Sequence, residues 1–261
     1  MKTCIILLVV YIIILIISYI PNKYFYIKRT NINDNFTNAS SQENNNYALK
    51  NIDFYVISLR NPTRLLNIDN QNKKLLDAKI NIIDAVNGIY IDQNKLLEDK
   101  VLTTNFSDIG NMKRNKEIGC FMSHEKIYNL IKNNDGRKRY SIIFEDDFNT
   151  ISDNIILSLN NILVVIDTME FDILFLGNTF DNVGSQIKDN IYSIDKNKYT
   201  IGNFAYLVNN KNIDKLINSI KPIDSPIDNK IDTLIKNNKL SCVVVYPNVF
   251  NYMVEITSEI L

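Results

Sequence analysis

Short apolar runs that alternate with segments of helical spacing restrict the folds open to this chain. Residues 52–59 (IDFYVISL) and 140–146 (YSIIFED) are largely apolar on both faces, which is typical of strands buried inside a sheet. We predict strands at 52–59, 79–86, 140–146, 171–178, 191–194, 205–209 and 241–250, and helices at 63–77, 117–133, 211–220 and 228–237. Strands that alternate with helices indicate an α/β domain whose central sheet is mostly parallel.

An apolar run near the N-terminus predicts a membrane segment. Residues 4–20 carry no charge, and their length lies at the short end of what spans a bilayer. Basic and aromatic residues follow the run, as they do at membrane interfaces. A cleaved signal peptide is the alternative, but no small-residue cleavage site follows Ile20. We therefore expect an N-terminal hydrophobic helix within residues 1–29 that acts as an uncleaved signal anchor, with its orientation open.

The next segment has the composition of a linker. Residues 30–50 are polar and rich in Asn and Ser, which is typical of a flexible stalk, so we place the folded domain at residues 51–261. N-glycosylation patterns occur at Asn35, Asn38 and Asn105. They matter only if the domain faces a lumen.

Composition excludes several classes of protein. With 29 basic and 29 acidic side chains the net charge is zero, which disfavours nucleic acid as a partner. The chain has only 7 Gly and neither a G-x-G-x-x-G nor a G-x-x-x-x-G-K motif, so a Rossmann dehydrogenase and a P-loop kinase are excluded. Its 3 Cys form no zinc pattern, and we expect Cys120 and Cys242 to be unreactive thiols rather than a disulfide.

Three consecutive acids follow the apolar run at 140–144. Glu145, Asp146 and Asp147 lie where the predicted strand ends, and ligands of open α/β sheets bind at the carboxyl ends of strands. Adjacent carboxylates repel one another unless a cation neutralises them, and hard divalent cations prefer carboxylate oxygens. A solvated acidic turn that caps the next helix is an equally good interpretation of this local pattern.

A second polar motif precedes the acids by about twenty residues. The segment Glu117–His124 (EIGCFMSH) contains the only His of the chain and a glycine, Gly119, that permits close approach of another backbone. A hydrogen-bonded structural role for His124 is the more common outcome for a lone His. Serine nucleophile chemistry is disfavoured because Ser123 lies next to His124 rather than in a strained elbow.

Eight segments, in order, resemble glycosyltransferase family 25, which includes lipooligosaccharide galactosyltransferases and collagen hydroxylysine galactosyltransferases. The segments are FYVISLRNPTR (54–64), DAVNG (84–88), EIGCFMSH (117–124), IIFEDDF (142–148), FDILFLGN (171–178), GNFAYLVN (202–209), PIDSPID (222–228) and VYPNVF (245–250) with SEI (258–260). The chain departs from the family pattern at Asn61-Pro62-Thr63, at Asn248 and at Glu259, and no departure removes an acid of the 145–147 triplet.

The resemblance implies a GT-A-like nucleotide-sugar-binding domain that uses UDP-galactose or UDP-glucose and Mn²⁺ or Mg²⁺. It identifies Asp147 as the direct metal ligand, with Glu145 as a second ligand. Asp146 and Glu145 are candidates for contact with the donor. Further donor-binding candidates are Arg60, Arg64, Ser123 and His124.

The resemblance also implies an inverting reaction, which needs a general base for the acceptor hydroxyl. Asp228 is the first candidate and Asp224 the second, because the repeated Pro-Ile-Asp leaves the register open. Asp172 is interpreted as structural, and Tyr206 either lines the acceptor site or packs in the core.

The resemblance implies two partners, a nucleotide-sugar donor and an acceptor that is a glycan or a collagen-like hydroxylysine chain. The apolar run at 4–20 predicts a third partner, a membrane bound through the N-terminal helix. We therefore expect a single-pass protein of the endomembrane system whose domain faces the lumen, or the bacterial or viral equivalent. A non-catalytic binding or scaffold protein that retains the fold is the alternative function.

Overall fold

The computed structural model describes residues 47–76, 78–152, 154–178, 182–200 and 202–253. Among these residues no helix is both long enough and apolar enough to cross a bilayer. The predicted anchor at 1–29 and almost all of the predicted stalk at 30–50 lie outside the described ranges.

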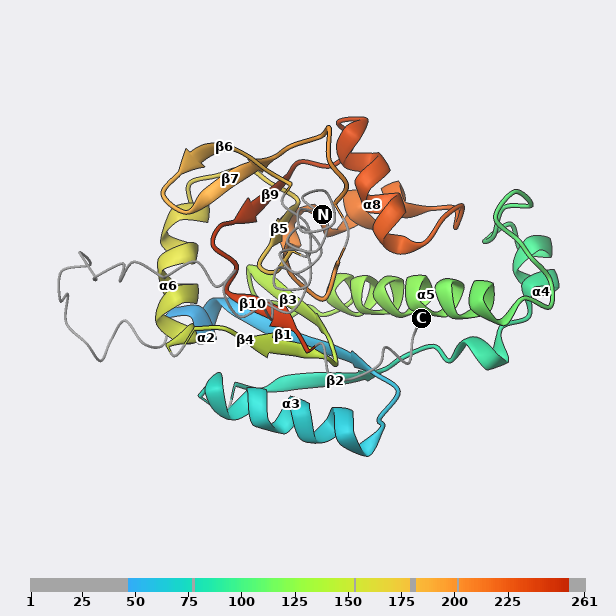
Figure 1. The fold of residues 1–261 in the computed structure, drawn as a ribbon, viewed down its shortest axis with the longest axis horizontal. Helices are drawn as coiled ribbons and strands as arrows, with labels where there is room; N and C mark the ends of the chain where they lie inside the picture. The colour runs from blue at the N-terminus through green and yellow to red at the C-terminus, as the bar shows by residue number, and fades with distance from the viewer. Residues whose placement is uncertain (1–46, 77, 153, 179–181, 201, 254–261) are drawn as a thin grey trace, which may run out of the picture. The chain divides into compact units, whose positions relative to one another are not determined.

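One eight-stranded sheet forms the centre of the described domain, in the order β2-β1-β3-β8-β5-β9-β7-β6 (Figure 1). Its strands are β1 (Ile52–Ser58), β2 (Ile80–Asp84), β3 (Tyr140–Glu145), β5 (Ile173–Phe175), β6 (Val183–Lys188), β7 (Ile191–Ile194), β8 (Ala205–Asn209) and β9 (Cys242–Val245). A separate two-stranded ladder pairs β4 (Phe148–Thr150) with β10 (Phe250–Tyr252).

The sheet is mixed, which corrects the prediction of a mostly parallel one. Parallel pairing joins β1 to β2, β1 to β3 and β5 to β9. Strand β8 runs antiparallel between β3 and β5, and the β6–β7 hairpin adds an antiparallel edge beside β9. The inserted β8 and the hairpin therefore explain why alternation of strands and helices along the chain did not predict the pairing.

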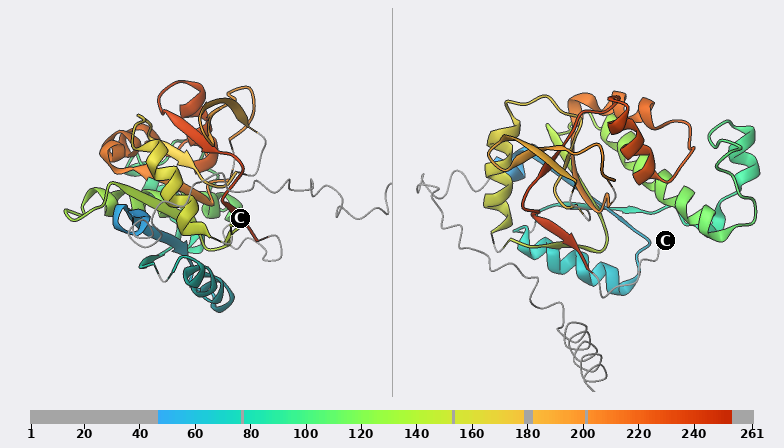
Figure 2. Two further views of the ribbon diagram at one scale, coloured as in Figure 1. Left: turned by 90° about the vertical axis from the view of Figure 1, so that its left-hand side faces the viewer. Right: turned by 45° about the horizontal axis from the view of Figure 1, so that its top comes forward.

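Helices cover both faces of the sheet (Figure 2). One face packs against α2 (Tyr47–Asn51), α3 (Pro62–Lys74) and α6 (Ile155–Ile166), and the other against α5 (Met112–Lys132), α7 (Ile213–Ile220) and α8 (Ile227–Lys236). The short helix α4 (Gln93–Glu98) and the 3₁₀ turns η3 (Gly88–Tyr90) and η4 (Asn210–Asn212) complete the domain. This layered α/β architecture agrees with the predicted fold class.

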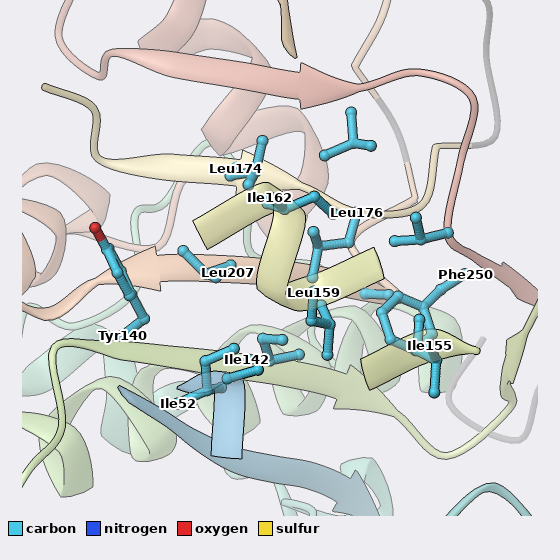
Figure 3. Packing of buried hydrophobic residues seen from close by; sticks show 14 of the residues in the cluster. Ile52, Tyr140, Ile142, Ile155, Leu159, Ile162, Leu174, Leu176, Leu207 and Phe250 are labelled. Atoms are coloured by element: carbon cyan, nitrogen blue, oxygen red, sulfur yellow. The ribbon is translucent and has the colours of Figure 1, made fainter. Parts of the chain in front are cut away.

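Alternation along β3 divides the core into two layers. Ile142 and Phe144 pack with α6, whereas Ile143 packs with α5 and α8 on the opposite face, and all three side chains are fully buried. Figure 3 shows the α6 layer, in which Leu159 and Ile162 of the helix meet the sheet. A strand that is buried on both faces in this way holds the residues at its end in fixed positions.

The folded domain extends beyond the predicted boundary at residue 51. Helix α2 packs against the α6 face of the sheet with the fully buried Ala48, whose backbone N–H donates to Asn160 Oδ1 of α6 at 2.7 Å. Cys120 and Cys242 are both free thiols, as predicted, whereas Cys4 lies outside the described residues.

Candidate active site

The three predicted acids lie at the carboxyl edge of the parallel strands. Glu145 is the last residue of β3 and is aligned with Ile57 near the end of β1. Asp146 and Asp147 form the turn that leads into β4, and Asp146 is almost fully buried. The acids therefore lie at the edge of the sheet where the sequence predicted them, at the carboxyl ends of the parallel strands.

A buried polar stripe on α3 holds this acidic turn in place. Asn61 caps the helix by accepting the Thr63 N–H, so the predicted turn at Asn61-Pro62 becomes the helix start. Farther along the helix, Asn67 Nδ2 donates to the carbonyl oxygens of Asp146 and Phe148, both at 3.0 Å. Sequence reasoning missed Asn67, although its spacing of three from Arg64 indicates one helix face.

Arg64 lies against the acids themselves. Its side chain is only 2% exposed, and Nη1 lies 3.2 Å from Asp147 Oδ2 and 3.5 Å from Asp146 Oδ1. Arg60 is different: it is half exposed, has a positive φ of 61° and forms an ion pair with Asp84 at the end of β2. Both arginines therefore follow β1 at the predicted edge, but only Arg64 contacts the acidic turn.

Asp147 has the properties of a ligand for a hard cation. Its Oδ1 atom is buried and has no hydrogen-bond partner among the described residues. Burial and the neighbouring charge of Glu145 raise the pKa of Asp147 to about 6, against the opposing effect of Arg64. A carboxylate that is shielded and incompletely neutralised fits Mn²⁺ or Mg²⁺, which bind carboxylate oxygens.

His124 is held by a buried hydrogen-bond chain. It is fully buried, and its Nδ1 lies 2.8 Å from the hydroxyl of Tyr206, which lies 2.7 Å from the hydroxyl of Tyr128. On the other side of the ring, Nε2 lies 3.6 Å from Glu145 Oε1. His124 is thus both hydrogen-bonded, as a structural histidine would be, and directed at the acidic turn, while Tyr206 packs inside the domain.

Ser123 supports the helix rather than facing the acids. Its hydroxyl donates to the carbonyl of Gly119 at 2.7 Å and accepts the Val86 N–H at 2.8 Å. Gly119 permits this contact, because a Cβ atom there would lie 2.6 Å from the Val86 carbonyl oxygen. The close backbone approach predicted for Gly119 is confirmed.

The two Pro-Ile-Asp copies have different surroundings. Asp224 is exposed, and its Oδ2 lies 2.7 Å from Lys230 Nζ. Asp228, in the first turn of α8, accepts the Gly202 N–H at 3.3 Å, and its Oδ1 is buried without a hydrogen-bond partner among the described residues. Burial and the charge of Glu145 raise the pKa of Asp228 to about 6, and His124 opposes this shift. The structure therefore brings Asp228, not Asp224, close to Glu145 and His124.

Asn203 is a site residue that sequence reasoning missed. It is 1% exposed, and neither Oδ1 nor Nδ2 has a hydrogen-bond partner among the described residues. Its backbone N–H lowers the pKa of Asp228, and the carbonyl of the next residue, Phe204, accepts the Glu145 N–H at 3.0 Å. Buried amides are normally hydrogen-bonded, so the unpaired carboxamide is unusual. One signal was available, because Asn203 occupies the Thr position of the family segment T-x-A-Y-L-I.

Asp172 has the structural role that was predicted. It is 2% exposed, its carboxylate accepts the Ser241 N–H at 2.7 Å, and it pairs with Lys215 at 2.5 Å. It joins the start of β5 to the start of β9, away from the acids.

Comparison with known proteins identifies a family. The family model described as "Glycosyltransferase family 25 (LPS biosynthesis protein)" matches residues 51–231. A comparison with curated proteins gives no match. Among solved structures, a UDP-glucose pyrophosphorylase complexed with UDP-glucose is 13% identical and has a TM-score of 0.41, covering 74% of this chain and 90% of that one. A 4-diphosphocytidyl-2C-methyl-D-erythritol synthase from Anaerococcus prevotii is 12% identical with a TM-score of 0.36, covering 81% of this chain and 94% of that one. Neither likeness is close enough to bear on function.

Proposed function

Since the chain belongs to glycosyltransferase family 25, we propose that it transfers galactose or glucose from a UDP-sugar to an acceptor hydroxyl with inversion. The observation that carries this proposal is a pair of shielded carboxylates on different elements. Asp147 after β3 and Asp228 on α8 both interact electrostatically with Glu145, and each keeps one oxygen buried without a partner among the described residues. Donor activation and acceptor deprotonation need two such groups.

Asp147, supported by Glu145, is suited to hold Mn²⁺ or Mg²⁺ on the donor side. Such a cation, when bound, stabilises the negative charge of a departing diphosphate. Arg64 and Asn67 position this carboxylate, because they fix the turn through side-chain and backbone contacts. Arg64 thus acts mainly as a positioning residue. Its positively charged guanidinium lies beside Asp147 and would also attract a phosphate bound there.

Asp228 is the group best suited to accept the proton of the acceptor hydroxyl. A general base works well when its pKa lies slightly below the working pH, and the shifted value of about 6 meets that condition. Asp224 is engaged by Lys230 and is exposed, which disfavours it as the base. Asn203, whose backbone contacts Asp228, supplies an unpaired amide that suits a sugar hydroxyl.

The test of this proposal compares Asp147→Asn, Asp228→Asn and Asp224→Asn in turnover of UDP-galactose and UDP-glucose with Mn²⁺. We expect the first two to lose at least about a hundredfold in kcat, and the third to stay within a few-fold of the wild type. Calorimetry with UDP and Mn²⁺ should show binding that Asp147→Asn weakens. Absence of any binding to wild-type protein would instead support a non-catalytic role. Acceptor panels containing glycans and hydroxylysine peptides then identify the acceptor class.

We also propose that residues 4–20 anchor the chain in a membrane, on the strength of their uncharged apolar sequence. The full chain should stay in the membrane pellet after alkaline carbonate extraction, and a chain that begins at residue 47 should be released. Asn105, which is exposed in the described domain, reports orientation. A glycosidase-sensitive size shift that Asn105→Gln reduces places the domain in a lumen, whereas protease attack from the cytosolic side places it in the cytosol.

A further inference from the structure

A thiol, an imidazole and a carboxylate meet beside the acidic turn. The ligand atoms of Cys120, His124 and Glu145 all lie within 4.8 Å of one another. Cys120 and His124 are four residues apart on α5, so both project from one helix face, and Glu145 approaches them from the end of β3. Two elements that are far apart in sequence therefore supply three potential metal ligands.

The imidazole of His124 is already oriented as a metal ligand. Histidines that bind metals usually engage their second ring nitrogen in a hydrogen bond, which fixes the ring and its tautomer. Here Nδ1 has that partner in the Tyr206 hydroxyl, which Tyr128 holds in turn. The remaining nitrogen, Nε2, is buried, faces Glu145 at 3.6 Å and has no hydrogen-bond partner among the described residues. This unpaired nitrogen is independent evidence for a ligand at this point.

The donor set indicates which cation would bind. Thiolate and imidazole ligands suit Zn²⁺, whereas Mn²⁺ and Mg²⁺ prefer the oxygen ligands that Asp147 offers. We propose that Cys120, His124 and Glu145 form a site for Zn²⁺ or a similar borderline cation, with the fourth position open to water. The Cys120 thiol must lose its proton to become a ligand, so binding of the metal releases a proton.

Occupation of this site has a consequence for the acidic turn. Glu145 is shared between the zinc ligands and the side chains that surround Asp147 and Asp228. A cation held by Glu145 removes this carboxylate from the donor side, so Zn²⁺ should inhibit transfer. This consequence rests on the proposed function, whereas binding of the cation does not.

The test uses Co²⁺ as a spectroscopic substitute for Zn²⁺ in the full-length protein. A thiolate bound to Co²⁺ gives a charge-transfer band in the near ultraviolet, which oxygen and nitrogen ligands do not give. We expect the wild type to show this band and Zn²⁺ to abolish it by displacement. Cys120→Ser should lose the band, and Cys242→Ser, which removes the other free thiol of the described domain, should keep it.

Two further measurements make the outcome decisive. Asp147→Asn should retain the Co²⁺ band and lose Mn²⁺-dependent UDP binding, which separates this site from the proposed donor site. His124→Ala should weaken Co²⁺ binding at least tenfold, and Cys120→Ala replaces Cys120→Ser if the latter does not fold. A wild type without a charge-transfer band, or a band that Cys120 variants retain, overturns the zinc site whatever the transferase assays show.

Discussion

At the scale of single residues, the unpaired carboxamide of Asn203 predicts a conflict between stability and binding. A buried polar group without a partner costs about 1–3 kcal/mol. Asn203→Leu should therefore leave the free energy of unfolding unchanged or raise it by about 1 kcal/mol in ligand-free protein, because leucine has a similar size and no polar atoms. If the amide contacts a sugar hydroxyl, the same substitution should lower kcat/KM at least tenfold. Chemical denaturation and steady-state kinetics measure the two effects.

Asn209 provides the matched control for this prediction. It is also buried and lies on β8, but its Nδ2 donates to the Phe171 carbonyl and its Oδ1 accepts the Lys211 N–H. Asn209→Leu leaves these partners unpaired and should lower the free energy of unfolding by about 1–3 kcal/mol. If Asn203→Leu destabilises the domain equally and leaves kcat/KM unchanged, then Asn203 has only a structural role.

Asp228 predicts a pH dependence of stability whose sign is opposite to that of an ordinary ion-paired carboxylate. Its pKa is about 6 in the folded protein and about 4 in the unfolded chain, so the folded state holds the proton more tightly. The contribution of this group is greatest below about pH 4 and is lost as the pH rises through 6. The free energy of unfolding of Asp228→Asn, relative to that of the wild type, should therefore be about 1–2 kcal/mol higher at pH 7 than at pH 4.5. Chemical denaturation in a chelating buffer at the two pH values measures this difference. An equal difference between variant and wild type at both pH values contradicts this.

Some residues of the candidate site could be predicted from the sequence, and others could not. The acid triplet, Arg64 and Asp228 could be named as candidates from the sequence because a strand end and a family segment mark them. Asn67 was missed because its role depends on which face of α3 meets the turn. The proximity of Cys120 to Glu145 depends on how α5 crosses β3, which no local pattern specifies.

At the scale of elements, the contact between α5 and the segment after β2 should reverse the usual effect of a Gly→Ala substitution on helix stability. Gly to Ala inside a helix usually stabilises by up to about 1 kcal/mol. At Gly119 the added Cβ would lie 2.6 Å from the Val86 carbonyl oxygen, so Gly119→Ala should destabilise by about 1–3 kcal/mol and displace the face that carries His124. Thermal unfolding monitored by circular dichroism measures the change. Gly136→Ala is the control, because the nearest atom to the added Cβ there is 3.6 Å away. Its free energy of unfolding should stay within about 0.5 kcal/mol of the wild type. Equal destabilisation by the two substitutions would refute the close contact at Gly119.

Most elements were predictable, and each miss has its own physical cause. Strands β1, β2 and β3 and helices α3, α5, α7 and α8 agree with the predicted ranges to within a few residues. The omitted elements include α6, a helix so apolar that both its sides favour burial, and β6, which is exposed along most of its length. The antiparallel direction of β8 depends on pairing with β3 and β5, and strand direction leaves no periodic signal in a sequence.

At the scale of the whole molecule, the described domain begins before the boundary that composition indicated. Helix α2 is bound to the domain through Ala48, whose N–H donates to Asn160, and through the Leu49 carbonyl, which accepts a hydrogen bond from Lys138 Nζ at 2.6 Å. Composition hides this helix, because its few residues follow a long polar segment and too few of them are apolar to show a period.

This boundary predicts different stabilities for two shortened chains. A chain that begins at Tyr47 retains α2, whereas one that begins at Ile52 exposes the surface that Ala48 covers and leaves the Asn160 carboxamide oxygen without its α2 donor. Because both chains lack residues 1–46, their difference isolates α2. The shorter chain should lose about 2–4 kcal/mol, a decrease of several degrees in Tm for a domain of this size. Differential scanning calorimetry measures this. Identical Tm values would show that α2 adds nothing to the domain and that the folded unit starts at β1.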